Sequence, residues 1–324
     1  MANITAETNG KTKDSIIVAA FTVMRPVHWI KNLSLFAAVF LSGTLFDKGQ
    51  LEKVIWAFVA FCLVTSATYI FNDILDIKAD RLHPTKKFRP VASGSLPVSI
   101  AIIEAIILAT SSFFIAILGG LNSLFLSVIA VYLAMQFFYS VGLKNVAILD
   151  IVIIAAGFVL RVYAGAFAID AHLSAWFLLC VVSAALFLAS GKRRAEINIA
   201  QNLNYATRKS LGTYRKELLN SYVTMFGNAS WMSWALFTFF ESPKASLPFW
   251  LTLSELSRTT AVDKLLMSTI PITIFGIMRY ESLIFEGKSE TPEKLILTDT
   301  SLIFAVGLWL LFIYWVLYSG ISVF

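Results

Sequence analysis

Nine apolar stretches, separated by short polar segments, run along the 324-residue chain. They cover residues 30–46, 54–71, 99–118, 121–141, 147–168, 173–190, 219–240, 262–284 and 302–318. Most approach the roughly 20 apolar residues that one helical crossing of a bilayer needs. A chain in lipid must satisfy its backbone polar groups internally, which helices do. The pattern therefore predicts an all-α, polytopic membrane helical bundle of about nine transmembrane helices.

The N-terminal segment has a different pattern from the rest of the chain. Residues 1–14 are polar, and a short apolar run follows from Ile16 to Val23. Arg25 and Pro26 come next, without the small residues of a cleavage site, so we expect a retained interfacial helix rather than a signal peptide. The predicted organisation is a polar segment with an interfacial helix over 1–24 and one transmembrane domain over 25–324.

Composition and charge add an orientation to this bundle. The chain is 58% hydrophobic and only 14% charged, which excludes an ordinary soluble domain. Of its 26 Lys and Arg residues, 20 lie in the segments that alternating crossings place on one side, and five lie on the other. Basic residues accumulate in cytoplasmic loops, so we expect a cytoplasmic N-terminus and an external C-terminus. Part of this bias is explained by orientation alone.

A cluster of acids follows the second crossing, in the segment NDILDIKAD. Asp73, Asp76 and Asp80 are three and four residues apart, so a helix would stack their carboxylates on one face. Such acids repel one another and need a compensating cation, for which Mg²⁺ is the natural candidate, with Asn72 orienting metal or phosphate. The alternative is a solvated helix end paired with nearby basic residues, namely Lys78, Arg81 and Lys86.

The next segment, RLHPTKKFRPVASGSLP, is basic and broken by prolines. A basic loop beside a carboxylate face can wrap a polyanion, and Lys86 and Arg89 are the first candidates for phosphate contacts. A patch for anionic lipid headgroups is the alternative. Upstream, Lys31 in RPVHWIKN is a further candidate for a headgroup contact.

A second polar motif, YSVGLKNVAILD, follows the fourth crossing. It places Tyr139, Lys144 and Asp150 at the same end of the bundle, where Lys144 could neutralise a phosphate and Asp150 could bind a second Mg²⁺. Arg161 lies eleven residues beyond Asp150, on the same helix face and roughly 16 Å deeper. A charge at that depth is costly, so Arg161 is a substrate-binding candidate, with a structural pairing as the alternative.

Further basic residues stand in the expected loop after the sixth crossing. The loop opens with GKRRAE and ends near the start of the seventh crossing. These residues anchor topology or bind anionic substrate, and the candidates are Lys192, Arg193, Arg194 and Arg215. The chain has no Gly-rich nucleotide loop or dinucleotide fingerprint, and its three histidines are scattered. We therefore expect neither ATP hydrolysis nor hydride transfer, and no nucleic acid as partner.

Taken in order, these motifs resemble the UbiA superfamily of intramembrane prenyltransferases, and in particular its decaprenyl-phosphate phosphoribosyltransferase branch. The segments that carry the resemblance are RPVHWIKN, NDILDIKAD, HPTKKFRPVASGSLP, YSVGLKNVAILD, GFVLRVYAGA, GKRRAE and TPEKLILTD. The resemblance implies Mg²⁺-dependent transfer of 5-phosphoribose from phosphoribosyl diphosphate to a polyprenyl phosphate. It also implies a bacterial cytoplasmic membrane, with the active site facing the cytoplasm.

Two other classes of function stay open from the sequence. In a UbiA-type prenyltransferase, the diphosphate would belong to an isoprenoid and an aromatic or lipid acceptor would attack it. A transporter would place polar or helix-breaking residues near the bilayer midplane, whereas these acids gather at one boundary. The oligomeric state is also open, with a homo-oligomer among the options.

Overall fold

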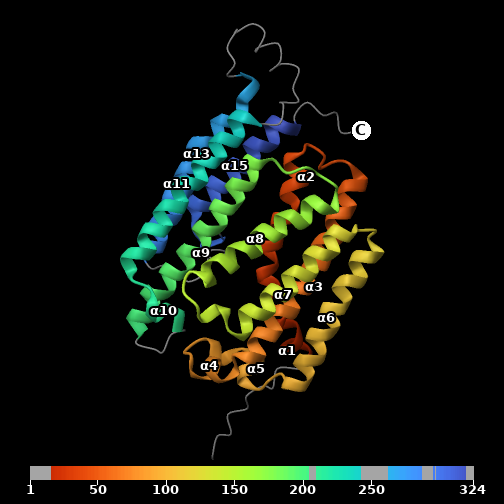
Figure 1. Cartoon of the computed structure of the whole chain (residues 1–324), viewed down its shortest axis with the longest axis vertical. Helices are drawn as coiled ribbons and strands as arrows, with labels where there is room; N and C mark the ends of the chain where they lie inside the picture. The colour runs from red at the N-terminus through yellow and green to blue at the C-terminus, as the bar shows by residue number, and fades with distance from the viewer. Residues whose placement is uncertain (1–15, 204–208, 242–261, 287–294, 296, 319–324) are drawn as a thin grey trace, which may run out of the picture.

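The computed structural model describes residues 16–203, 209–241, 262–286, 295 and 297–318. All regular secondary structure within these ranges is helical, which confirms the predicted all-α class (Figure 1). Helix α1 (Ile16–Val23) matches the predicted N-terminal helix, while residues 1–15 lie outside the described part. The same holds for most of the TPEKLILTD motif.

The N-terminal half contains four long helices with short helices between them. The long ones are α3 (Lys48–Leu75), α6 (Val98–Leu118), α7 (Ser123–Val141) and α8 (Leu149–Ala168). The short ones are η1 (Pro26–Phe36), α2 (Ala37–Leu41), α4 (Ile77–Leu82), η2 (Lys86–Phe88), α5 (Pro90–Ser93) and η3 (Leu143–Asn145). The polar motifs of the sequence fall mostly on these short helices, beside the ends of the long ones.

The C-terminal half continues the bundle. It comprises α9 (Ala175–Leu203), α10 (Lys209–Thr213), α11 (Lys216–Phe240), η4 (Val262–Thr269), α13 (Ile270–Phe285) and α15 (Thr300–Tyr318). Within the described residues, six helices are long and apolar enough to span a bilayer: α3, α6, α7, α8, α9 and α15. The chain is therefore an integral membrane protein, although the predicted number of nine crossings is not confirmed.

The first predicted crossing, residues 30–46, is wrong as a continuous α-helix. This segment forms the 3₁₀ helix η1 and the five-residue α2 instead. Close packing of η1 on α8 accompanies this shape: a Cβ on Gly165 would stand 1.9 Å from the backbone oxygen of Leu35. Asn32 is also buried there. Asn32 therefore lies on the face of η1 that packs against α3 and α8, while Val27 and Leu33 of the same helix are exposed.

Several apolar cores hold the bundle together, and the two largest lie in different parts of it. One lies among α3, α7 and α8 and includes Phe61, Phe125 and Tyr132, while the other joins α9, α11 and α15 around Trp234 and Ile313. Helix α8 packs against α9 and links the two halves. In Figure 1, α4, α5 and α10 lie at one end of the bundle and α2 at the other. The short helices with the polar motifs therefore gather at a single end.

Candidate active site

The acidic motif lies where α3 gives way to α4. Asp73 belongs to the last turn of α3, Asp76 stands at the junction with φ −93° and ψ 5°, and Asp80 belongs to α4. The expectation of one continuous helix face is wrong, because the helix is interrupted at Asp76. The interruption separates the three carboxylates into two groups.

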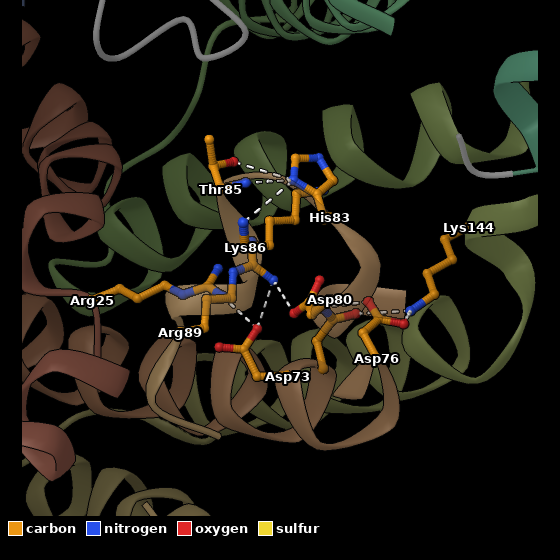
Figure 2. Close-up of polar contacts among 10 residues, drawn as sticks. Arg25, Asp73, Asp76, Asp80, His83, Thr85, Lys86, Arg89 and Lys144 are labelled. Atoms are coloured by element: carbon orange, nitrogen blue, oxygen red, sulfur yellow. Dashed lines mark hydrogen bonds and ion pairs between the residues drawn. The ribbon is translucent and has the colours of Figure 1, made fainter. Parts of the chain in front are cut away.

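Asp73 and Asp80 form the first group, and Arg89 bridges them. Its Nη1 donates to Asp73 Oδ1 at 3.0 Å and to Asp80 Oδ2 at 2.6 Å (Figure 2). Arg25, which precedes η1, forms a second ion pair with Asp73 Oδ1. Both carboxylates are buried, so these guanidinium groups supply the charge compensation that buried acids require.

Asp76 forms the second group with Lys144 of η3. The Lys144 ammonium donates to Asp76 Oδ1 at 2.5 Å and to Asn72 Oδ1 at 3.1 Å, and Asn72 Nδ2 donates to Asp76 Oδ2 at 3.1 Å. Lys144 is itself buried. The predicted proximity of the motifs after α3 and after α7 is thus present, as a buried ion pair between them.

The basic loop is ordered around its histidine. His83 Nδ1 accepts hydrogen bonds from the backbone N–H groups of Thr85 and Lys86, at 3.2 and 3.3 Å (Figure 2). Arg81 donates from Nε to the carbonyl oxygen of Ala92 at 2.9 Å, which ties α4 to α5. These bonds hold the loop over the acids, where Arg89 reaches them from above in the view of Figure 2.

The carboxylates of the three acids are suitable ligands for a divalent cation, but they do not point toward one common position. Within the described residues, no three Asp, Glu, His or Cys side chains form a group ready to hold a metal ion. Carboxylate oxygens are nevertheless the ligands that Mg²⁺ prefers. Asp73 Oδ2 is buried and has no hydrogen-bond partner in the described structure, so one oxygen is available to a ligand. Three carboxylates face three cations here, namely Arg25, Arg89 and Lys144.

Asp150 has a different environment from the other acids. It is fully buried at the start of α8, 3.1 Å from Arg193 Nε, and accepts hydrogen bonds from Tyr214 (2.6 Å) and Ser210 (3.3 Å). Both carboxylate oxygens therefore have protein partners. This favours a structural anchor between α8, α9 and the α10 region over the predicted second metal ligand.

The prediction that GKRRAE opens a loop is wrong, because Gly191–Glu196 lies inside α9. Arg193 is completely buried there and also contacts Glu196 and Tyr139. The sequence did not indicate Tyr214 and Ser210 as partners of Asp150, since no spacing pattern links them. Burial and the hydrogen bond to Asp150 raise the pKa of the Tyr214 phenol, which therefore stays protonated as a donor at neutral pH.

The remaining candidates lie in several environments. Arg194 is buried and donates to Asn220 Oδ1 at 2.6 Å, whereas Arg215 is exposed at the start of α11. Lys31 in η1, Lys86 in η2 and Lys192 in α9 are half-buried. Of the predicted phosphate contacts, the structure brings Arg89 and Lys144 directly to the acids.

Arg161 lies in the core of the bundle rather than among the acids. Its guanidinium donates to Asn32 Oδ1, to the Gly157 carbonyl oxygen and to the Tyr132 hydroxyl, at 2.7–2.9 Å. The rings of Tyr132 and Phe158 stand 5.1 and 5.5 Å from it. These contacts favour the structural alternative, with aromatic faces and neutral acceptors stabilising the charge.

Apolar helices with a cluster of acidic and basic side chains at one end are the arrangement expected of a membrane-embedded enzyme that acts on anionic substrates. The family model described as "UbiA prenyltransferase family" matches residues 32–240. The chain belongs to this family, which confirms the predicted resemblance and makes the protein a transferase.

Named relatives support the same placement. Decaprenyl-phosphate phosphoribosyltransferase of Corynebacterium glutamicum is 38% identical over 85% of this chain and 80% of its own length. The protein of the same name from Mycolicibacterium smegmatis is 37% identical over 88% of each chain. A UbiA homolog from Archaeoglobus fulgidus, solved with DMAPP and Mg²⁺, shares the fold with a TM-score of 0.67 and 16% identity. That match covers 92% of this chain and 99% of the solved one.

Proposed function

We propose that this protein transfers 5-phosphoribose from phosphoribosyl diphosphate to a polyprenyl phosphate, with release of diphosphate. The observation that carries the proposal is the cluster of Asp73, Asp76 and Asp80 with Arg25, Arg89 and Lys144 at one end of the bundle. The names of the relatives support the phosphoribosyl donor and the lipid acceptor. The predicted orientation places this end of the bundle in the cytoplasm of a bacterial cell, where a soluble sugar diphosphate is available.

The acids are the candidates for holding Mg²⁺, which when bound supplies Lewis-acid stabilisation of a departing diphosphate. As it stands, the cluster is close to neutral, because three carboxylates face three cations. Compensation of the acids by a divalent ion would release Arg89 and Lys144 to bind phosphate oxygens. Arg89 suits a forked contact, while the Lys144 ammonium acts as a point charge. These basic groups orient the donor and stabilise negative charge on its leaving group.

The acceptor needs little activation from the protein. An oxygen of the lipid phosphate is already anionic, so it can form a bond to the anomeric carbon without a general base. The bond from that carbon to the diphosphate oxygen breaks, and its electron pair leaves with the diphosphate. The task of the site is then to position two anions, and basic side chains lower their mutual repulsion.

A transfer assay tests the proposal directly. Purified protein is incubated with Mg²⁺, radiolabelled phosphoribosyl diphosphate and a polyprenyl phosphate, and the label is followed into the organic phase. We expect Mg²⁺-dependent labelling of the lipid and a product mass equal to the acceptor plus one phosphoribosyl group. Transfer from a prenyl diphosphate to an aromatic acceptor, with no phosphoribosyl lipid formed, would support the prenyltransferase alternative instead.

A further inference from the structure

An apolar groove of about 360 Å³ lies between α6 and α7, with α3 as its floor. Small side chains widen it, including Ala67 of α3, Ala105 and Ala109 of α6 and Ala134 of α7. Among the described residues, one hydroxyl lines it, and this group, on Thr68, donates to the Thr65 carbonyl oxygen of its own helix at 2.8 Å. The groove therefore offers almost no hydrogen-bonding groups to an occupant, which suits a hydrocarbon.

The groove begins close to the acidic cluster. Thr68 precedes Asn72 by four residues on α3, so Asn72 lies one helical turn, about 6 Å, further along nearly the same face. The rings of Phe71 and Phe137, which also line the groove, stack at 5.2 Å between centroids. Asn72 is the residue that accepts from Lys144. A chain in the groove would thus have its polar head within reach of the Asn72–Lys144 pair.

Its other end lies well inside the bundle. Ala109 is eleven residues from the start of α6, or about 16 Å along the helix, and Ala134 is seven residues from the end of α7, or about 10 Å. These depths reach about the middle of a roughly 30 Å hydrocarbon layer. An occupant would remain in the apolar layer while its head reached the membrane boundary.

We propose that this groove binds the isoprenoid chain of the polyprenyl phosphate acceptor. The inference rests on the proposed function, and it adds where the acceptor's tail lies. Three features select this occupant: an apolar lining, a position at membrane depth and an end beside cationic and amide groups that can meet a phosphate. The alanines leave room for the methyl branches of an isoprenoid, which a groove lined by larger side chains would exclude.

Filling the deep part of the groove tests the assignment. Ala109→Trp and Ala134→Trp each place an indole in the path of a long tail. With a long-chain polyprenyl phosphate, we expect the acceptor KM to rise at least tenfold. With geranyl phosphate, whose short tail stops before these positions, the KM should rise less than threefold, and the KM for phosphoribosyl diphosphate should stay within twofold. Ile117→Trp, an exposed position on the far part of α6, is the matched control and should behave like the wild type.

A photo-crosslinking measurement keeps the proposal testable if a Trp variant fails to fold. Wild-type protein is irradiated with a polyprenyl phosphate that carries a diazirine on its third or fourth isoprene unit, and the adducts are mapped by mass spectrometry. Adducts on α3, α6 and α7 around the groove are expected, and excess unlabelled polyprenyl phosphate should suppress them. A phospholipid of similar length should not suppress them.

The results separate failure of the groove from failure of the proposed function. Unchanged long-chain KM values in both folded Trp variants, or adducts confined to other helices, would overturn the groove assignment while wild-type phosphoribosyl transfer stands. Suppression by ordinary phospholipid as effective as by polyprenyl phosphate would show a general lipid contact and also overturn it. Absence of phosphoribosyl transfer by the wild type would instead reject the proposed function.

Discussion

Asp76 is the least buried of the three clustered acids and pairs with a single cation. Its carboxylate is half-buried and is neutralised by Lys144, whereas Asp73 and Asp80 share Arg89. Asp76→Asn retains an oxygen that can accept from Lys144 but removes the negative charge that would attract a divalent ion. We expect kcat/KM to fall at least 100-fold, about 2.7 kcal/mol in transition-state stabilisation, and the Mg²⁺ concentration for half-maximal rate to rise. Steady-state assays across a Mg²⁺ titration measure both effects.

Asp47→Asn is the matched control for this substitution. Asp47 caps the start of α3, accepting from the backbone N–H groups of Gly49 and Gln50, and Asn caps helices about as well as Asp. The Asp47→Asn variant should therefore keep wild-type kinetics. If Asp76→Asn has the same rate and Mg²⁺ dependence as Asp47→Asn, Asp76 does not help to hold Mg²⁺.

At the site, the sequence predicted which residues matter but not which residues they contact. Acid spacing identified Asp73, Asp76 and Asp80, and chain order indicated that Lys144 lies near them. The partners of each charge came only with the fold, because they depend on which helices pack together. Arg193 shows this most clearly: a basic run typical of a loop places its middle residue in a fully buried ion pair with Asp150.

At the scale of helices, Gly165 decides how α8 meets η1. A methyl group on Gly165 would stand 1.9 Å from the backbone oxygen of Leu35. This is far shorter than a van der Waals contact, and the clash is with backbone rather than with a flexible side chain. Gly165→Ala should therefore destabilise the protein by about 2 kcal/mol or more, the cost of overpacking a core. A lowered midpoint of thermal unfolding in detergent, with lower expression of folded protein, is the expected observation.

Gly157 provides the comparison on the same helix. Its Cβ would meet only side-chain atoms at 3.4–3.7 Å, an ordinary contact distance, and Ala favours helix over Gly. Gly157→Ala should keep or slightly raise the unfolding midpoint. Equal midpoints for the two variants would show that the η1–α8 contact is looser than the structure indicates.

Helix ends were predicted well where an apolar run has polar ends and poorly where charged turns are buried in the protein. The ranges 99–118 and 121–141 agree with α6 and α7 to within two residues, because an apolar run between polar ends defines a lipid-facing helix. Helix α9 continues to Leu203, 13 residues past the predicted end, since its charged turns are covered by α8 and the α10 region. Residues 30–46 were mispredicted because one face of η1, with the buried Asn32 and Leu35, packs closely against α3 and α8.

For the whole molecule, the distribution of charge predicts its orientation in the membrane. The short helices α4, α5 and α10 lie at one end of the bundle in Figure 1, and 20 of 26 basic residues belong to segments predicted for that side. Short basic segments are retained in the cytoplasm. The predicted orientation would put Arg89 and Lys144 on the side of the membrane where the proposed water-soluble phosphoribosyl donor is found. Orientation and proposed chemistry therefore depend on the same residues.

Single-cysteine labelling tests this orientation. Lys87 in η2 and Lys48 at the start of α3 are both exposed and lie toward opposite ends of the bundle. The native Cys62 lies buried within α3, and Cys180 lies within α9, so the parent protein should give little background. In intact spheroplasts, a membrane-impermeant maleimide should label Lys48→Cys and spare Lys87→Cys, and inverted vesicles should reverse the result. The opposite pattern would place the acidic cluster outside the cell, away from a cytoplasmic sugar diphosphate, and would contradict both the orientation and the donor.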